Sequence, residues 1–537
     1  MRFNAFSAAA SAAIFLGACT VAGCAGPQRH TDTLVIDQQH EPIALNPALE
    51  NGPLEWGLIL FQYLVKFDDR GRLIGDAAIE APTLANGGIS RDGLTVTYHL
   101  RKGLRFSDGV PLTAKDCVYS INAINDPANN VQSRYAYDRV ALAEAPNAYT
   151  LVLHLKRPFA PLVSVVMTPQ GFPILPEHAL VKYHNFNRIP FDDAPIGSGP
   201  YRVVRWVHGE EVDMEANPYY YQGPPKISHL IVRFVPNGTT AMNQLRTGEA
   251  DGIFNDPNLG DYSMLRSVSG IDATATLIDA VGALIFNTQD PITSDARVRQ
   301  ALSMAIDVPS MVTKAYRGAL DGHEPGRGLF MWAYDPKVYT DVPYDPAAAN
   351  RLLDEAGWKR GPDGVRRKDG KPLDLLLILQ ANSPYELVAS SVIASYEHAI
   401  GAVVTLKQYQ VTVFAAPVDL GGPVYGGKFQ MALYPFTDGD DPDTTDQFAC
   451  KNVPPHGYNK SRFCDPRVDA LLSQGQSTFD QARRREAYVQ LEGILREAMP
   501  IMLLYQQRQL NAFTTRLHGQ TTSLSGAFWN VADWTLQ

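Results

Sequence analysis

Residues 101–116 read RKGLRFSDGVPLTAKD and combine a turn with the start of a helix. Residues 94–100 come immediately before them, alternate in strand fashion and predict a β-strand. Thr113 is a good N-cap, and Asp116 falls in the first turn of a helix that we expect to extend to Ile124. The stretch therefore predicts a strand, a turn and a helix in direct succession.

A second stretch places two glycines in front of a predicted strand. Residues 195–201 read PIGSGPY, and residues 215–220 read EANPYY. Gly197 and Gly199 permit a tight bend before a strand that we expect over residues 201–206. The Asn-Pro pair within the later stretch predicts the end of the strand that follows.

Several later segments have the caps and the apolar spacing of helices. In residues 295–307 the apolar side chains recur at helical spacing, and we expect Ser294 to be the N-cap. Asp345 caps a predicted helix over residues 346–356, with proline in its first position. Further helices are expected over residues 58–64, 241–247, 466–475 and 483–498, and strands over 33–37, 148–155 and 429–434.

Together these motifs resemble the signatures of the family 5 extracellular solute-binding proteins, the peptide- and nickel-binding components of ABC importers. The resemblance runs in the family order from about residue 45 to residue 510. Residues 101–116 contain every residue type of the family's first pattern, and Cys117 follows where valine is usual. In the second pattern, Ser198 stands in place of threonine.

The resemblance implies an α/β protein with the bilobal periplasmic-binding-protein fold, of the large type with three subdomains. Two crossing segments would form a hinge, and an extra subdomain would be inserted in the first lobe. On this pattern we expect lobe I to comprise residues 33–60, 187–280 and 509–537, the inserted subdomain residues 61–186, and lobe II residues 281–508.

The composition is that of a globular chain with more than one domain. The chain has 537 residues, of which 45% are hydrophobic and 19% charged, and its net charge is -9. The absence of a Lys/Arg block argues against nucleic acid as a partner. The sequence contains no Gly-x-Ser-x-Gly elbow, no His-Glu-x-x-His motif and no complete phosphate-binding loop. We therefore expect a monomeric binding protein without a cofactor or metal; a hydrolase and a structural cell-envelope protein are the alternatives.

The N-terminus has the features of an export signal. A single positive charge precedes the small, apolar residues 5–16, and two lipobox-like tetrads end at Cys19 and Cys24. With the family resemblance, this pattern predicts a lipoprotein signal over residues 1–23, a lipid on Cys24 and a tether over residues 24–32. Cys19 is the alternative lipid acceptor, and an ordinary cleaved signal is the other alternative. The expected location is the extracytoplasmic face of the cell membrane.

Three cysteines lie outside the signal. Cys117 stands among apolar residues and is expected to be a buried free thiol. Cys450 and Cys464 flank a loop rich in Pro, Gly and Asn, and in an exported chain they predict a disulfide, with free thiols as the alternative. A zinc site would need more ligands than these two and His456 provide.

Residues 434–443 read YPFTDGDDPD and follow a predicted strand. Gly439 and Pro442 predict a turn there. Crowded carboxylates repel one another unless solvent, a cation or backbone N–H groups offset the repulsion. The stretch is therefore either a solvated acidic turn or a receptor for a positively charged group.

The family resemblance favours the receptor. In peptide-binding members, an aspartate three residues before an Asp-Pro pair binds the α-amino group of the ligand. Asp441-Pro442 is the pair here, so Asp438 is the matching residue, while Asp440 and Asp443 are expected to be solvated. The family's tryptophan before this aspartate is absent. The predicted amine site accordingly contains Tyr434, Phe436, Thr437, Asp438 and Gly439.

For the carboxylate end of the peptide, this sequence has no residue that matches the family's arginine. Residues 379–385 read LQANSPY and resemble the segment in which dipeptide-specific members carry an arginine for the ligand carboxylate. Asn382 and Ser383 stand in that place, which suggests a longer peptide or a different ligand. Candidate carboxylate ligands are Arg317, Arg327 and Lys407.

The expected function is capture of short peptides by their free N-terminus in a cleft between the lobes. The bound peptide would then pass to an ABC permease with its ATPase subunits. The alternative is a different ligand of the same family: a nickel chelate, haem or an opine-like compound.

Overall fold

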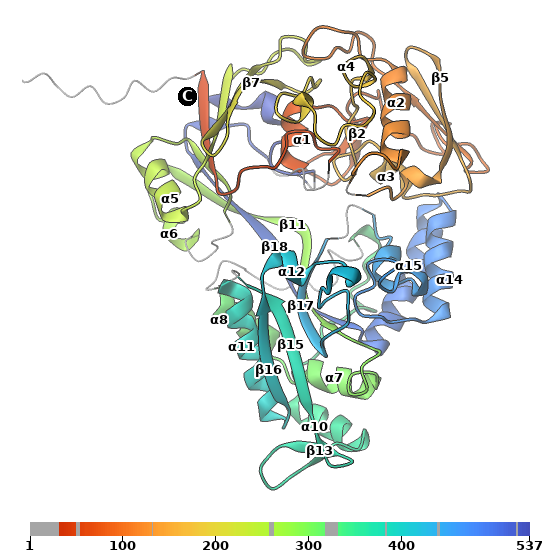
Figure 1. Cartoon of the computed structure of the whole chain (residues 1–537), viewed down its shortest axis with the longest axis vertical. Helices are drawn as coiled ribbons and strands as arrows, with labels where there is room; N and C mark the ends of the chain where they lie inside the picture. The colour runs from red at the N-terminus through yellow and green to blue at the C-terminus, as the bar shows by residue number, and fades with distance from the viewer. Residues whose placement is uncertain are drawn as a thin grey trace, which may run out of the picture.

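The structure is a computed structural model that describes residues 32–49, 54–131, 133–256, 262–316, 331–381, 384–437, 441–521, 523 and 525–537. The chain forms an upper and a lower lobe, each of mixed α/β structure, as Figure 1 shows. Two long strands, β11 (Ile271–Phe286) and β18 (Ile501–Thr514), run between the lobes and pair antiparallel with each other. The predicted two-lobed fold with two crossing segments is confirmed.

One ten-stranded sheet extends through both lobes, in the order β16-β15-β17-β11-β18-β10-β1-β9-β8-β7. In the upper lobe β1 lies between β9 and β10 and is parallel to both. In the lower lobe β15 is parallel to β16 and β17. The upper strands are β1 (Thr33–Gln38), β7 (Tyr201–Val207), β8 (Glu211–Ala216), β9 (His229–Phe234) and β10 (Gly252–Asp256). The lower ones are β15 (Asp374–Gln380), β16 (Val403–Tyr409) and β17 (Met431–Thr437).

Residues 61–186 form the right-hand part of the upper lobe in Figure 1. Their three-stranded sheet has the order β4-β6-β5, and α2 packs on β5 and β6. Thr113 and Asp116 form the predicted capping box at the start of α2. The elements are β2 (Val65–Phe67), β3 (Leu73–Gly75), β4 (Thr95–His99), α2 (Ala114–Asn125), β5 (Val140–Asn147), β6 (Thr150–Leu155), α3 (Leu162–Val165) and α4 (Glu177–Leu180).

Helices cover the sheet of the lower lobe, and a hydrophobic cluster lies on each of its faces. Met431 and Leu433 of β17 contribute to one cluster, and Ala432 and Phe436 to the other, because successive strand residues point to opposite faces. The helices are α7 (Ala296–Met304), α8 (Val308–Tyr316), α10 (Pro346–Glu355), α11 (Pro384–Ala399), α12 (Val411–Phe414), α13 (Thr445–Phe448), α14 (Pro466–Ser477) and α15 (Gln481–Ala498).

The remaining elements are short. A hairpin-like sheet consists of β12 (Lys359–Arg360), β13 (Arg366–Lys368) and β14 (Lys371–Pro372), and the chain ends with β19 (Leu517–His518) and β20 (Thr535–Leu536). The upper lobe also contains α1 (Leu54–Leu60), α5 (Gly238–Thr247) and α6 (Tyr262–Arg266). Within the described residues, no helix has the length and apolar character needed to cross a membrane.

The helix predicted over residues 58–64 is wrong in its position. Helix α1 ends at Leu60, and the following backbone bonds to other segments: Leu64 N–H donates to Met167 C=O at 2.8 Å. Gly197 and Gly199 pack against the end of α1, where an added Cβ would lie 1.8 Å from Leu60 O and 2.5 Å from Leu60 C, respectively. These two glycines are therefore required for close backbone approach, in addition to any bend.

The predicted N-cap of the helix at residue 296 is also wrong by one position. Asp295, not Ser294, caps α7, and its carboxylate accepts a hydrogen bond from Arg297 N–H at 2.9 Å. The Ser294 hydroxyl instead donates to Pro291 C=O at 3.3 Å. Asp345 caps α10 as predicted.

Candidate functional site

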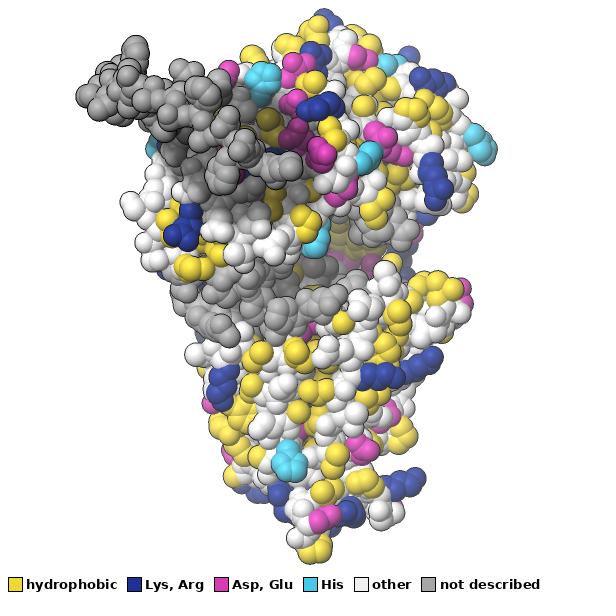
Figure 2. All heavy atoms as spheres, turned by 60° about the vertical axis from the view of Figure 1, so that its left-hand side comes forward, with side chains coloured by type: hydrophobic (Ala, Val, Ile, Leu, Met, Phe, Trp, Pro, Cys, Tyr) yellow, Lys and Arg dark blue, Asp and Glu magenta, His cyan; other side chains and the backbone are white. Residues whose placement is uncertain are grey.

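The candidate ligand site begins where β17 ends, at Thr437. β17 lies between β11 and β15; β15 pairs with its first two residues, and β11 pairs with it as far as Ala280↔Thr437, so β11 positions its C-terminal end. Figure 2 shows a hollow between the two lobes, and acidic and basic side chains are interspersed over the face drawn. Asp438, Gly439, Asn382, Ser383, Arg317 and Arg327 lie outside the described residues, and only the backbone of Thr437 is described.

Tyr434 and Phe436 lie on the same face of β17 and surround a lysine of the protein itself. The ammonium nitrogen of Lys460 is 4.3 Å from the ring centre of Tyr434 and 5.6 Å from that of Phe436. The rings of Tyr425 and Tyr458 lie 5.6 and 5.7 Å from the same nitrogen. Aromatic faces attract a cation, so these four rings interact favourably with the Lys460 ammonium group. We call Lys460 and the four rings the lysine cage.

The lysine cage changes the interpretation of the two aromatic residues. They were predicted to line a site for the amino group of a ligand, and they contact a cation that the chain supplies. Burial raises the pKa of Tyr434, so its phenol stays neutral at physiological pH. Sequence reasoning missed Lys460, because a lysine within a loop carries no pattern that distinguishes it from a surface charge.

Asp441 is buried and paired. Its carboxylate oxygen lies 2.5 Å from Nη2 of Arg484 on α15, and both side chains are more than nine-tenths buried. Nε of Arg484 also donates to Gly475 C=O at 2.8 Å. Burial by itself would lower the pKa of Arg484, but the charges of Asp441 and Tyr488 and the hydrogen bonds to both together outweigh burial and raise this pKa. Asp441 accepts a hydrogen bond from Asp443 N–H at 3.1 Å, which agrees with its predicted role in shaping the turn.

Asp443 was predicted to be solvated, and this prediction is wrong. Its carboxylate accepts hydrogen bonds from the hydroxyls of Tyr135 and Thr445 and, at 2.9 Å, from Nε2 of Gln476. Burial raises the pKa of Asp443, and the charge of Asp441 raises it further. The sequence could not indicate this environment, because Tyr135 is 308 residues away along the chain.

The acidic turn therefore belongs to a contact between the two lobes. Besides the hydroxyl of Tyr135, the upper lobe contributes Ala160 N–H, which donates to Gln476 C=O at 2.8 Å. It also contributes the Ser164 hydroxyl, 3.4 Å from Asp441 Oδ2. In Figure 1, α3, which contains Ser164, lies above α14 and α15. We call this set the lobe–lobe contact: Tyr135, Ala160 and Ser164 against Asp441, Asp443 and Gln476.

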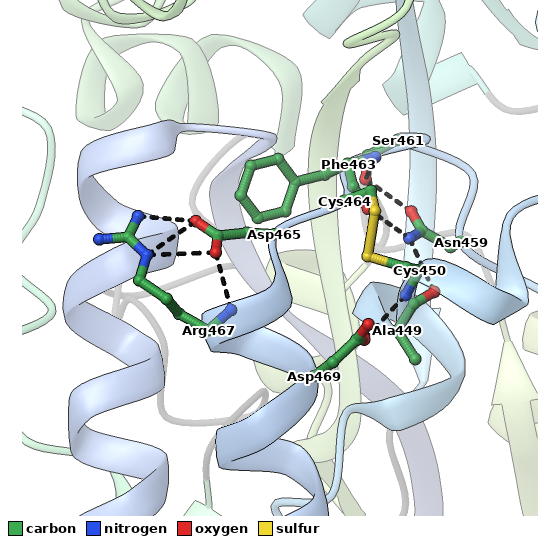
Figure 3. Close-up of a disulfide and its surroundings, with 9 residues drawn as sticks. All are labelled: Ala449, Cys450, Asn459, Ser461, Phe463, Cys464, Asp465, Arg467 and Asp469. Atoms are coloured by element: carbon green, nitrogen blue, oxygen red, sulfur yellow. Dashed lines mark hydrogen bonds and ion pairs between the residues drawn. A yellow bond between two sulfur atoms is a disulfide. The ribbon is translucent and has the colours of Figure 1, made fainter.

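A disulfide constrains the loop that carries Lys460. Cys450 and Cys464 are bonded, as predicted, and Figure 3 shows their surroundings. Asp469 of α14 accepts a hydrogen bond from Cys450 N–H at 2.9 Å, so the start of the loop is also held by the helix. Asn459 donates to Phe463 C=O at 2.7 Å across the loop. Cys117 is a buried free thiol, as expected, and burial raises its pKa.

Of the three candidate carboxylate ligands, Lys407 is the one that lies within the described residues. Lys407 is exposed on the edge strand β16, with its ammonium 4.9 Å from the ring of Tyr409. Among the described residues, no group of three His, Cys, Asp or Glu side chains is arranged to hold a metal ion. The described part of the site thus offers aromatic faces, one caged lysine and paired carboxylates.

Residues 81–452 match the family model of the bacterial extracellular solute-binding proteins, family 5. The chain belongs to this family. It is 29% identical to protein XP55 of Streptomyces lividans over 97% of this chain and 93% of that protein. It is 24% identical to the oligopeptide-binding protein AppA of Bacillus subtilis, over 98% and 96% of the two chains.

Solved structures of the family share the fold. NikZ of Campylobacter jejuni in complex with Ni(L-His) has a TM-score of 0.78 and 26% sequence identity, covering 94% of this chain and all of that one. The structure of Bacillus subtilis AppA in complex with a nonapeptide has a TM-score of 0.77 and 22% identity, covering 94% and 99%. The chain thus has the bilobal periplasmic-binding-protein fold that its sequence motifs predict.

Proposed function

We propose that this solute-binding protein captures short peptides in the cleft between its lobes and delivers them to an ABC permease. The main support is that β17, paired along its length with β11, leads into acidic residues that meet the upper lobe at Tyr135. The relationship to AppA, named as oligopeptide-binding, supports a peptide as the ligand class.

In this proposal Asp438 binds the free amino group of the peptide. A carboxylate enclosed in a closed cleft needs a cationic partner, and a peptide N-terminus supplies a charge with three N–H donors. Burying either charge alone is costly, so the pair favours ligands with a free amine. Backbone pairing along the rest of the peptide would make binding tolerant of side-chain sequence.

The test is calorimetric titration of the purified protein with a mixed library of short peptides. Free peptides should bind, and their N-acetylated forms should bind far more weakly. Asp438→Ala should remove most of the affinity, whereas Asp419→Ala, at an exposed position, should leave it unchanged. Equal binding of free and acetylated peptides, or near-normal affinity in Asp438→Ala, would exclude the amine mechanism.

The second candidate ligand is a metal chelate or another anionic small molecule, including haem or an opine. The similarity to NikZ, whose structure holds Ni(L-His), favours this class. Mass spectrometry of small molecules released from the purified protein on denaturation distinguishes a peptide from a chelate.

Delivery, anchoring and the absence of turnover are further parts of the proposal. Cys24 would carry the lipid at the extracytoplasmic face of the membrane and tether a monomer beside the permease. Labelling with a radioactive fatty acid should disappear in Cys24→Ala and persist in Cys19→Ala.

Peptides incubated with the protein should be recovered intact, since we expect a binding protein and not a hydrolase.

A further inference from the structure

Phe479 belongs to the lower lobe but packs on the upper one. It lies between α14 and α15, and its half-buried side chain contacts the hydrophobic cluster of the upper lobe. Every other described residue of that cluster, and of those packed at its edge, lies within residues 34–254 or 513–536. This apolar contact therefore crosses from one lobe to the other.

The ring of Phe479 lies over the backbone of Gly93. A Cβ added to Gly93 would lie 3.0 Å from Cε2 of Phe479 and 3.1 Å from Cβ of Pro158. Gly93 has a φ of +69°, in the turn before β4, so the backbone there favours glycine in any case. Its lack of a side chain leaves room for the phenyl ring. We call Gly93 and Pro158 the seat of Phe479.

The corner that presents Phe479 is held by helix caps. The carboxylate of Asp480 caps α15 and accepts hydrogen bonds from the backbone N–H groups of Ala482 and Arg483 at 3.0 and 3.2 Å. The hydroxyl of Thr478 accepts one from Asp480 N–H at 3.2 Å. Because α14 and α15 also pack on each other, Phe479 is presented from a fixed corner of the lower lobe.

The upper-lobe segment that begins at Pro158 meets the lower lobe a second time. Ala160 N–H donates to Gln476 C=O, in the last turn of α14, at 2.8 Å. Between these two points, the buried ring of Phe159 packs edge to face with Tyr135, with ring centres 5.7 Å apart. Phe479 thus adds an apolar part to the lobe–lobe contact, and one upper-lobe segment links the polar and apolar parts.

All of the groups in this extended contact belong to the protein. An apolar side chain that is withdrawn from water contributes stability in proportion to the area buried, whether or not a ligand is present. Phe479 and its seat lie on different lobes, so this contribution is gained when the lobes close and lost when they open. It therefore shifts the equilibrium between open and closed forms in the same direction as a ligand would.

We propose that Phe479 and its seat form a latch that keeps the lobes closed before a ligand binds. The lobes then open only transiently, when the ring leaves the seat, and this opening sets the rate at which the cleft exchanges its ligand. The latch does not depend on which ligand the cleft takes. Its effect on peptide exchange rests on the proposed function.

The test is a distance measurement between the lobes by pulsed electron paramagnetic resonance. Nitroxide labels are attached at Leu142→Cys in the upper lobe and Leu420→Cys in the lower lobe, both exposed positions, and bound cargo is then removed by unfolding and refolding. The parent should give one distance without ligand. In Phe479→Ala a longer distance should appear, and the ratio of open to closed protein should rise about tenfold, as expected for loss of part of a buried phenyl contact.

Two further variants separate the latch from folding. Leu471→Ala removes a half-buried side chain of α14 that packs within the lower lobe, and it should leave the distances unchanged. Phe479→Leu keeps apolar atoms over the seat and should restore most of the closed form. A ligand-free parent that is mostly open, or equal distance distributions in the parent and in Phe479→Ala, overturns the proposal.

The exchange rate is measured with a tripeptide that carries a fluorophore at its C-terminus. Its dissociation should be about tenfold faster from Phe479→Ala than from the parent, in line with the larger open fraction. A parent that does not bind the tripeptide would count against the proposed peptide function alone. The latch would still be decided by the ligand-free distances.

Discussion

The two lobes are joined in two ways that differ in kind. At one junction, β11 and β18 continue from lobe to lobe as a backbone ladder that pairs residues from Ile271 to Ile285 with partners from Thr514 to Ile501. At the other, the lobe–lobe contact consists of a few side chains and one backbone bond from segments far apart in the sequence. The ladder cannot open without unfolding strands, whereas the contact can open at the cost of a few hydrogen bonds.

This difference indicates which junction responds to ligand. A ligand shifts a hinge equilibrium only through interactions that differ between the open and closed states. The acidic turn lies directly after β17, so the residues proposed to bind ligand and those that join the lobes occupy one short segment. Four variants test this difference, and their expected effects decrease in the order given.

The largest effect should come from the buried ion pair beneath the contact. Arg484→Met leaves Asp441 buried without its partner, and breaking such a pair costs about 3–5 kcal/mol of unfolding free energy. Arg483→Met is the matched control on the same helix, because its pair with Asp480 is exposed and contributes about 0–1 kcal/mol. Urea denaturation measures both, and similar losses in the two variants would contradict a structural role for the buried pair.

The disulfide should contribute the next largest effect. Cys450 and Cys464 are 14 residues apart, and closing a loop of this size stabilises a protein by roughly 3 kcal/mol through the unfolded state. The double variant Cys450→Ser, Cys464→Ser should therefore melt at a lower temperature than the oxidised parent. Adding a reductant should lower the melting temperature of the parent and not that of the variant. An unchanged melting temperature in the variant would mean that the loop is held by other bonds.

Loss of one hydrogen bond across the lobes should affect ligand binding more than folding. Tyr135→Phe removes the hydroxyl that donates to Asp443. We expect the affinity for the cleft ligand to fall by about 1.5–3 kcal/mol, typical of a hydrogen bond to a charged group. Small-angle X-ray scattering should show a larger radius of gyration with ligand present. Tyr149→Phe, at an exposed position in the same lobe, is the control; equal affinities in both variants would remove Tyr135 from the closure mechanism.

The smallest effect should be a dependence on pH. The pKa of Asp443 is raised from its ordinary 3.8, first by burial and then by Asp441. Its stabilising contribution is therefore present below the ordinary value and is lost as the pH rises through the raised one. The side chain introduced by Asp443→Asn cannot ionise. The unfolding free energy of this variant, relative to that of the parent, should therefore increase from about pH 4 upward, by less than about 1.4 kcal/mol per pH unit. Parallel pH profiles of the two proteins would contradict the raised pKa.

Helix ends that depend on neighbouring residues in the sequence were predicted correctly. Thr113 and Asp116 form their capping box, and Asp345 caps α10, because capping depends on neighbours within one helical turn. The error at residues 58–64 has a tertiary origin: the chain after Leu60 bonds to Met167 and packs on Gly197 and Gly199. An apolar run alone cannot distinguish a buried helix from a buried extended segment.

By itself the sequence determined the family, the two-lobed fold and the disulfide, because these depend on long ordered motifs and on cysteine spacing. Only the tertiary structure assigned partners to the charges of the acidic turn. Asp441 and Asp443 have the same local sequence signal as a solvated turn, yet one pairs with Arg484 and the other meets Tyr135 across the lobes. Whether a charge is solvated or buried depends on what packs against it, and for this turn the packing comes from hundreds of residues away.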